Sequence, residues 1–169
     1  MGRSERRAPF PIESDVMLPL AMNESRQQIP LSQDAALVLA LAGTAMAFSH
    51  SAEDEAERWL RAMRMHGRVG QALQGLGVGE SPLMTGSEAR PGRPPLGPQV
   101  VDDATACAQD YAYRRGVSNV GTPELLFAVM EVYGRMFDRA LYLRGASREE
   151  LLERLSTVEA DAEPVENGS

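Results

Sequence analysis

Apolar residues recur at helical spacing along most of this chain, and a glycine or a capping residue marks the ends of each run. The clearest run lies between Gly116 and Gly145. Thr122 is a suitable N-cap there, and Pro123 fits the first helical position, where its missing N–H costs nothing. The apolar positions that follow form one stripe before Gly134 and another after it: Leu125, Leu126, Val129 and Met130, then Met136, Phe137, Ala140 and Leu141. The pattern predicts two short helices, joined at Gly134, that need partners to bury their apolar faces.

A longer apolar run predicts the first helix of the chain. It begins at Ser32, a candidate N-cap, and ends near Phe48. Apolar residues lie on nearly all of its sides, which is typical of a central, buried helix. Gly43 within it is interpreted as a position of close packing rather than a break.

Four more helices complete the pattern. Three of them precede Gly116, over about 52–65, 67–77 and 98–115. The third carries Cys107 on its inward stripe, where a thiol is expected to behave as a small buried apolar group. Near the end of the chain, Ser147 and Glu150 form a capping box that predicts a helix from Ser147 to Ser156.

Composition supports an all-α fold and excludes some kinds of chemistry. Isoleucine, which favours strands, is rare, whereas Ala, Leu, Met, Arg and Glu are abundant. All 17 basic residues are arginines. A coding bias towards GC-rich codons accounts for this, and it leaves no lysine for a phosphate-binding loop or a Schiff base.

Charge and cysteine content bear on partners and compartment. The net charge of −7 argues against a nucleic-acid-binding protein. The single cysteine, Cys107, cannot form an internal disulfide and suits a reducing cytosol. The longest apolar run, 35–48, is shorter than the roughly 20 residues of a membrane span. His50 and His66 have no Cys or carboxylate cluster at ligand spacing. We therefore expect a cytoplasmic protein with no metal or other cofactor and no nucleic-acid or membrane partner.

The two halves of the chain are similar to each other. The aligned positions keep their spacing, with an offset that grows slightly along the chain: Ala42 with Ala108, Trp59 with Leu125, Leu60 with Leu126, Ala62 with Ala128, Met63 with Val129, Gly67 with Gly134, Arg68 with Arg135, Leu73 with Leu141 and Gly77 with Gly145. Internal similarity of this kind is typical of tandem helical repeats that close one core together.

At these residues the chain resembles the Clp amino-terminal domain, the doubled helical module at the front of Clp-type AAA+ unfoldases. The second copy matches the family's repeat pattern at Ala108, Arg114–Arg115–Gly116, Val120–Gly121–Thr122, Leu125–Leu126, Ala128 and Gly145. The first copy lacks the Val-Gly-Thr element but keeps Trp59–Leu60, Ala62, Gly67, Val69, Leu73 and Gly77–Val78. The resemblance covers 31–156.

The resemblance implies a fold of about eight helices in two pseudo-symmetric repeats, and a role in binding substrates or adaptor proteins. With it, the chain divides into a flexible N-terminal segment, a first repeat, a Gly/Pro-rich linker, a second repeat and a disordered acidic tail, at 1–30, 31–78, 79–98, 99–156 and 157–169. In some family members a glutamate after Gly-Thr helps to hold phosphorylated arginine. Here that position is Pro123, with Glu124 beside it, and Glu57 by offset in the first copy.

We expect a protein without catalytic activity that acts as adaptor, decoy or regulator for a Clp unfoldase, protease, adaptor or client. Neither a phosphate-binding loop nor the spacing of a catalytic triad is present in the sequence. The predicted partner-binding residues are Glu57, Arg58, Arg61, Arg64, Thr122 and Glu124. For the arginines a solvated face is the alternative, because Asp54–Arg58 and Glu57–Arg61 are favourable i,i+4 pairs.

A second function from another class stays open. A repurposed helical-repeat protein could bind a small hydrophobic ligand or peptide in a groove lined by adaptable methionine side chains. The candidates are Met17, Met46, Met63, Met65 and Met136.

Overall fold

The computed structural model describes residues 27–79 and 92–162, and seven helices lie in these ranges. Their bounds are Gln33–Met46 (α2), Ala52–Arg64 (α3), Gly67–Gly75 (α4), Val100–Arg115 (α5), Thr122–Tyr133 (α6), Arg135–Tyr142 (α7) and Arg148–Ala162 (α8). The predicted all-α fold is confirmed, since the pairing of β type in the described ranges is one isolated bridge between Leu31 and Val120. None of these helices combines the length and the apolar character that crossing a membrane requires.

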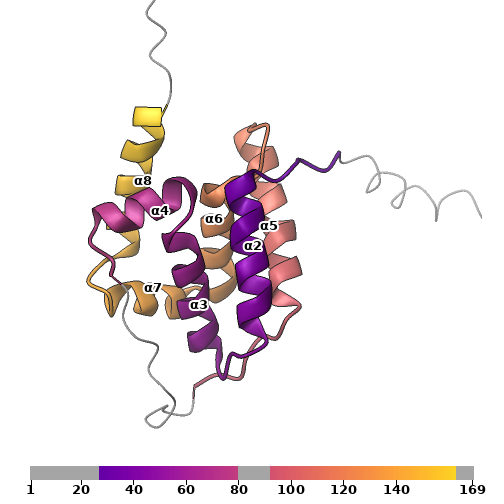
Figure 1. Ribbon diagram of the computed structural model, residues 1–169, viewed down its shortest axis with the longest axis vertical. Helices are drawn as coiled ribbons and strands as arrows, with labels where there is room; N and C mark the ends of the chain where they lie inside the picture. The colour runs from indigo at the N-terminus through magenta and orange to yellow at the C-terminus, as the bar shows by residue number, and fades with distance from the viewer. Residues whose placement is uncertain (1–26, 80–91, 163–169) are drawn as a thin grey trace, which may run out of the picture.

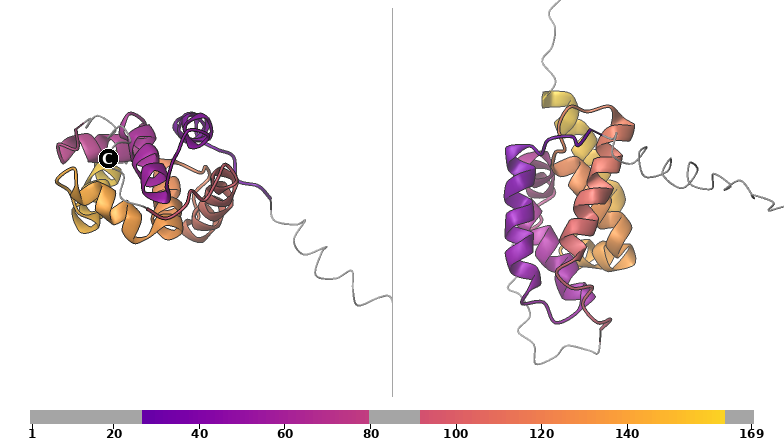
Figure 2. Two further views of the ribbon diagram at one scale, coloured as in Figure 1. Left: turned by 90° about the horizontal axis from the view of Figure 1, so that it is seen from below. Right: turned by 90° about the vertical axis from the view of Figure 1, so that its right-hand side faces the viewer.

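Two helices, α3 and α6, form the centre of the fold (Figure 1). Helix α3 packs against α2, α4, α6 and α7, and α6 packs against α5 as well as α3, α4 and α7. Helix α8 packs on α4. Helices α2 and α5 therefore lie on one side of the central pair, and α4, α7 and α8 lie on the other, as the views in Figure 2 also show.

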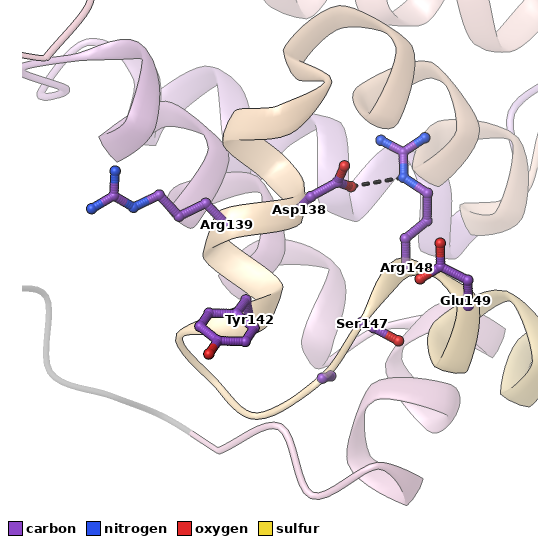
Figure 3. Close-up of a pocket in the computed structure, with 7 residues that line it drawn as sticks. Asp138, Arg139, Tyr142, Ser147, Arg148 and Glu149 are labelled. Atoms are coloured by element: carbon purple, nitrogen blue, oxygen red, sulfur yellow. Dashed lines mark hydrogen bonds and ion pairs between the residues drawn. The ribbon is translucent and has the colours of Figure 1, made fainter.

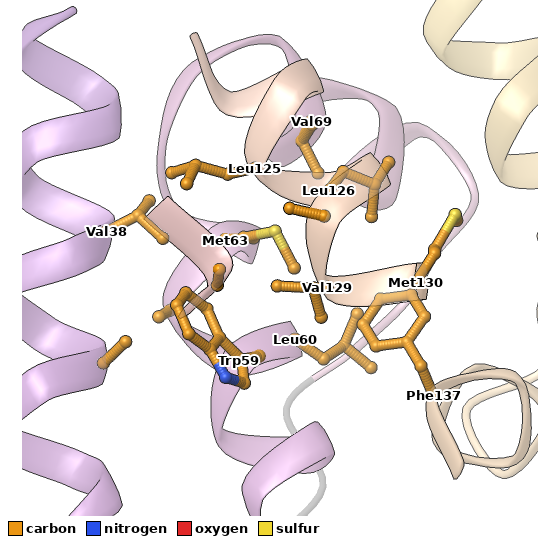
Figure 4. Close-up of a cluster of buried hydrophobic side chains, with 14 of the residues drawn as sticks. Val38, Trp59, Leu60, Met63, Val69, Leu125, Leu126, Val129, Met130 and Phe137 are labelled. Atoms are coloured by element: carbon orange, nitrogen blue, oxygen red, sulfur yellow. The ribbon is translucent and has the colours of Figure 1, made fainter. Parts of the chain in front are cut away.

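The hydrophobic core lies where α3 and α6 face each other (Figure 4). Helix α3 contributes Trp59, Leu60 and Met63, and α6 contributes Leu125, Leu126 and Val129. Val38 from α2, Val69 from α4 and Phe137 from α7 close this cluster. The apolar stripes predicted for the two helices that meet at Gly134 are confirmed, although Met136 is only partly buried.

Local sequence signals set most helix ends where they were expected. Ser32 Oγ accepts a hydrogen bond from the Ala35 N–H at 3.1 Å, and Ser147 with Glu150 forms the predicted capping box. The N-cap prediction for Thr122 is wrong by one residue, because Gly121 is the N-cap and Thr122 begins α6. The cap is formed by the Glu124 carboxylate, which accepts from the Gly121 N–H at 2.7 Å.

Helix α2 corrects the prediction of a central, buried helix. Only one side of it is buried, through Ala35, Val38, Ala42 and Met46. Its other side faces solvent, with Leu37 43% exposed and Leu41 48% exposed. An almost entirely apolar sequence does not reveal which side packs, so position in the fold had to come from the tertiary contacts.

Two stretches predicted to be flexible or disordered are partly ordered. Ile29 exchanges hydrogen bonds of 3.0 and 2.7 Å with the Gln109 side chain on α5, which corrects the prediction of a flexible segment for residues 27–30. Helix α8 continues to Ala162, so the predicted disordered tail does not begin at Thr157. The remaining parts of the predicted N-terminal segment, linker and tail lie outside the described residues, at 1–26, 80–91 and 163–169.

Candidate functional site

The partner-binding residues predicted on α3 do not form one free surface. Arg58 pairs with Asp54 at 3.1 Å, as the i,i+4 spacing predicted. Its terminal nitrogens also donate to the carbonyl oxygens of Ala45 and Phe48, both at 3.3 Å. Because those carbonyls lie at the end of α2, Arg58 joins α3 to that end and its role is structural.

Arg64 has a comparable structural role at the other end of α3. Its Nε donates to the Val78 carbonyl at 2.8 Å, and its own carbonyl accepts from Gln74 Nε2 at 3.0 Å. These bonds hold the C-terminal turn of α4 against α3. Of the three arginines predicted as partner-binding, Arg61 is the one whose side chain is exposed.

Glu57 corrects a second expectation. It was expected to pair with Arg61, but its Oε2 lies 2.5 Å from Nη2 of Arg144, in the turn between α7 and α8. Nη1 of Arg144 donates to the Gly79 carbonyl at 2.9 Å, and the arginine side chain is only 5% exposed. Arg144, in the second half of the chain, therefore binds both α3 and the end of the first half at Gly79.

Thr122 and Glu124 lie inside the fold, which corrects the prediction that they face a partner. Their exposed fractions are 2% and 3%. Thr122 Oγ1 accepts a long hydrogen bond of 3.4 Å from the Val69 N–H at the start of α4. Glu124 forms an ion pair with Arg115, whose Nη2 lies 3.0 Å from Glu159 on α8. This ion network joins α5, α6 and α8.

An exposed corner remains where α3 gives way to α4. We call Arg61, Met65 and Arg68 the basic corner. Both arginines are exposed and Met65 is 61% exposed. Gly67 turns the chain here with a φ of 64°, and a Cβ at this position would lie 2.6 Å from Thr122 Oγ1. Guanidinium groups beside an apolar thioether suit an acidic protein segment.

The sequence interpretation missed a buried polar group, which we call the Glu55 cluster. The Glu55 side chain is fully buried on α3. Its Oε2 accepts from the Tyr133 hydroxyl at 3.0 Å and the Leu96 N–H at 3.2 Å. Its Oε1 accepts from the Gly97 N–H at 3.1 Å and the Ser49 hydroxyl at 3.3 Å. The carboxylate thus fastens the segment before α5 to the start of α3.

Tyr133 links this carboxylate to the core. Its hydroxyl accepts a hydrogen bond of 3.1 Å from Trp59 Nε1. Burial, and then the negative charge of Glu55, raise the pKa of Tyr133, so the phenol stays protonated. The signal in the sequence was Glu55 itself, which lies four residues before Trp59 on the buried face of one helix.

Cys107 is half-buried rather than fully buried, and its surroundings are polar. Its Sγ lies 3.3 Å from Glu131 Oε2, which also accepts from the Tyr111 hydroxyl at 2.7 Å. Burial, and then the hydrogen bond to the Glu131 carboxylate, raise the pKa of the Cys107 thiol to about 11. The predicted behaviour as a small apolar group is therefore incomplete, and the raised pKa opposes the thiolate that a nucleophile needs.

A shallow hollow of about 380 Å³ lies at the turn between α7 and α8 (Figure 3). Its lining combines charged and aromatic side chains: Asp138, Arg139, Tyr142, Ala146, Ser147, Arg148 and Glu149. Asp138 and Arg148 neutralise each other in an ion pair of 2.7 Å. Nothing in this lining resembles a reaction centre, since the charges are paired or exposed.

Metal chemistry and known relatives add no assignment. Within 27–79 and 92–162, no group of three or more His, Cys, Asp or Glu side chains is placed to hold a metal ion. No protein-family model matches the chain, and no curated protein is similar enough to it to count as a match.

Proposed function

We propose that this protein is a non-catalytic binding module of the Clp amino-terminal type, acting as adaptor, decoy or regulator in a Clp unfoldase–protease system. The observation that carries the proposal is a correspondence between the helices α2, α3, α4 and the helices α5, α6, α7. The Clp family enters through the sequence resemblance, and the correspondence supports the doubled architecture that the resemblance implies.

Aligned residues occupy matching places in the two sets of helices. Ala42 on α2 and Ala108 on α5 are both fully buried. Leu60 on α3 and Leu126 on α6 meet in the same core cluster. The remaining aligned core positions are also buried in both copies: Trp59 with Leu125, Ala62 with Ala128, Met63 with Val129 and Leu73 with Leu141.

The turns that end α4 and α7 agree down to their hydrogen bonds. Gly77 and Gly145 have φ values of 72° and 82°, a left-handed backbone that other residues rarely adopt. The N–H of the residue after each glycine donates to the carbonyl of the aligned leucine at 3.1 Å, from Val78 to Leu73 and from Ala146 to Leu141. The same left-handed glycine turn also ends α5 at Gly116, where the Val117 N–H donates to the Ala112 carbonyl at 3.2 Å, so the turn fits repetition of one unit but is not specific to it.

The basic corner is the surface that we assign to partner binding. Arg61 and Arg68 remain exposed after the structural roles of Arg58 and Arg64 are taken into account. Exposed Met65 distinguishes this pair of arginines from other exposed arginines, such as Arg135 and Arg139 on α7. An acidic segment of a Clp component or client is the partner that this corner suits best.

The alternative function, a groove for a small hydrophobic ligand, is not favoured by the positions of the methionines. Met46 and Met63 are buried in the core, whereas Met65 is 61% exposed. Met136 is partly buried against the core on α7, and Met17 lies outside the described residues. Two of the four described methionines are therefore core residues, whereas Met65 faces solvent, which does not favour a shared groove.

The proposal is tested with the purified full-length chain and the purified Clp unfoldase and protease of the same organism. Direct binding is measured by biolayer interferometry, and the degradation rate of a fluorescent unfolded substrate is measured with and without the chain. We expect binding that weakens at high salt, and a change in the degradation rate.

A charge-reversed variant locates the surface. Arg61→Glu with Arg68→Glu should weaken binding at least tenfold at low salt and leave the melting temperature nearly unchanged, because both side chains are exposed. Arg135→Glu with Arg139→Glu is the matched control, since these arginines are exposed on α7 and Arg135 aligns with Arg68. Equal loss in both variants would place the effect in net charge rather than in the basic corner. Absence of binding and of any change in degradation would refute the proposed function.

A further inference from the structure

The solvent-facing side of α2 has a ridge of large side chains beside a furrow of small ones. The ridge comprises Leu37, Leu41, Thr44 and Phe48, of which Phe48 is 67% exposed. The furrow comprises Ala36, Ala40, Gly43 and Ala47, all exposed. Both rows follow the same helical spacing, so they run side by side along the helix; the furrow ends one residue beyond it, at Ala47, and the ridge two residues beyond it, at Phe48. Figure 2 shows α2 at the edge of the described part of the molecule, where it packs on α3, α5 and α6 through its buried side.

Gly43 has no explanation within residues 27–79 and 92–162 of a single copy. A Cβ built at this position would meet nothing within 4 Å, so this part of the fold does not need the absence of a side chain there. Glycine is the poorest helix former after proline, and Gly43 lies in the interior of α2. A mid-helix glycine that no described residue of the same copy requires is accounted for if the backbone of another copy approaches closely.

The same side of α2 lacks charge. Between Asp34 and Glu53 the sequence contains no Asp, Glu, Lys or Arg. The Thr44 hydroxyl donates to the Ala40 carbonyl at 3.1 Å, which leaves no unpaired side-chain donor in the ridge. Since the chain carries a net charge of −7, two copies repel each other over most of their surfaces. This side of α2 is a surface on which two copies can meet without opposing like charges.

We propose that α2 pairs in antiparallel orientation with α2 of a second copy, about a twofold axis near Ala42 and Gly43. In this arrangement the ridge of each copy enters the furrow of the other, and Leu37 lies opposite Ala47 of the second copy. A twofold interface must be complementary to itself, and a ridge next to an equal furrow meets that requirement. A foreign helix would need only one of the two features. The inference does not depend on the proposed function.

The size of the surface sets the strength of the pairing. A helix of 14 residues is about 21 Å long. A stable dimer buries about 800 Å² on each partner, which is more than one face of such a helix offers. We therefore expect a weak dimer that dissociates on dilution.

Sedimentation equilibrium of the full-length chain from about 1 μM to 1 mM tests the pairing. The apparent mass should rise from the chain mass of 18.4 kDa towards twice that value. Leu41→Glu should raise the dissociation constant at least tenfold without changing the helical circular dichroism. Leu143→Glu is the matched control, since Leu143 is 63% exposed on another surface, and it should leave the dissociation constant unchanged.

Substitutions of Gly43 separate packing between copies from the stability of one copy. Gly43→Ala should raise the melting temperature, because nothing in the fold opposes a Cβ there. Gly43→Leu should fill the furrow and weaken association at least tenfold, while the chain stays folded. A chain that stays at 18.4 kDa throughout would overturn the proposal, as would a dimer that Leu41→Glu and Gly43→Leu leave intact.

Cross-linking between copies tests the orientation. In a Cys107→Ser background, Leu41→Cys should form a disulfide with Gly43→Cys in a mixture, because a ridge residue then faces a furrow residue near the axis. Leu37→Cys should form one with Ala47→Cys in a mixture, but neither should form one with itself. Self-cross-linking of Leu37→Cys would show parallel pairing and overturn the proposal. A monomer that binds an apolar peptide along this side of α2 would also overturn it.

Discussion

The Glu55 carboxylate offers a sharp test of how polar bonds hold this helical fold together. Replacing Glu55 with Gln keeps the shape of the side chain but turns one of its two acceptor oxygens into an NH₂ donor. Each oxygen of Glu55 currently accepts from one hydroxyl and one backbone N–H. Whichever way the amide is turned, one hydroxyl and one backbone N–H, of Leu96 or Gly97, will face a donor.

The magnitude follows from these bonds. A hydroxyl can rotate away, but a backbone N–H cannot, and a buried donor without an acceptor costs about 1–3 kcal/mol. Hydrogen bonds to a charged acceptor are worth about 1.5–3 kcal/mol, so the change to a neutral amide weakens the remaining ones as well. We expect Glu55→Gln to lower the free energy of unfolding by about 2–4 kcal/mol. Complete loss of the acceptor in Glu55→Ala should cost more, because it also leaves a cavity.

Tyr133→Phe tests the same cluster from the other side. Its hydroxyl donates to Glu55 at 3.0 Å and accepts from Trp59 at 3.1 Å, so the variant loses both bonds. We expect a cost of about 1–3 kcal/mol. Since Glu55→Gln and Tyr133→Phe disturb one shared bond, the double variant should cost less than the sum of the two single variants, by about 1 kcal/mol.

Urea unfolding followed by tryptophan fluorescence is the assay. Trp59 is the single tryptophan, and it is fully buried next to the cluster, so its emission reports directly on this part of the core. Hydrogen exchange at Leu96 and Gly97 gives a local readout, because these amides should exchange faster in Glu55→Gln. Glu153→Gln is the matched control, since this glutamate is exposed on α8. If Glu55→Gln changed stability by less than about 0.5 kcal/mol and left both amides protected, the reasoning would be refuted.

Three further predictions concern the core, the thiol and catalysis. Leu126→Ala should lower the free energy of unfolding by about 2–5 kcal/mol in urea titrations, because Leu126 is fully buried between the central helices; a loss below about 1 kcal/mol would contradict its place in the core. Alkylation of Cys107 by iodoacetamide should keep rising with pH up to about 11, where its thiol titrates, whereas an ordinary thiol reaches its plateau about two units lower. Glu131→Gln should speed the reaction at pH 8, because it removes the negative charge that disfavours the thiolate, and an unchanged rate would exclude that cause. The purified chain should show neither ATPase nor peptidase activity, and turnover that co-purifies with it would falsify the non-catalytic assignment.

Helix positions followed from the sequence because the signals are local. Capping side chains such as Ser32 and Ser147 act on backbone groups three residues away, and a glycine ends a helix through its own φ. For this reason α3 and α5 begin and end within two residues of their predicted bounds. The last six residues of α8, beyond Ser156, were missed because the acidic composition of the tail was given more weight than Pro164, which follows Ala162 by two residues and is a helix stop signal.

The sequence did not predict which side of a helix is buried where apolar and polar positions are poorly separated. An apolar residue at almost every position of α2 gives no preferred side, so burial could not be assigned before the neighbouring helices were known. The Glu55 cluster was not predicted, for the opposite reason: the charged pattern of the helix was clear, but it indicated that Glu55 is exposed to solvent. A glutamate in a strongly charged helix is normally solvated, and its donors at Leu96 and Gly97 come from a segment about 40 residues away.

The arginines of α3 were read as surface charges for a related reason. Main-chain carbonyls at the ends of helices accept hydrogen bonds, but they leave no mark in a sequence pattern. Arg58 and Arg64 each donate hydrogen bonds to such carbonyls. Two of the three arginines predicted to contact a partner therefore stabilise the fold instead. Arg61 has no helix end within reach and stays exposed.

A chain whose basic residues are all arginine relies on the geometry of the guanidinium group. Arg144 uses separate nitrogens for Glu57 and the Gly79 carbonyl, and Arg115 uses separate nitrogens for Glu124 and Glu159. A lysine ammonium has three donors, but all of them lie on one nitrogen, so it cannot reach two acceptors as far apart as those met by separate guanidinium nitrogens. A coding bias accounts for the absence of lysine. Even so, two links between distant segments of the fold, made by Arg144 and Arg115, depend on the planar, forked shape of the guanidinium group. Arginine-to-lysine changes at these two positions are therefore not conservative, whereas at the exposed Arg61 the same change alters little but the shape of a surface charge.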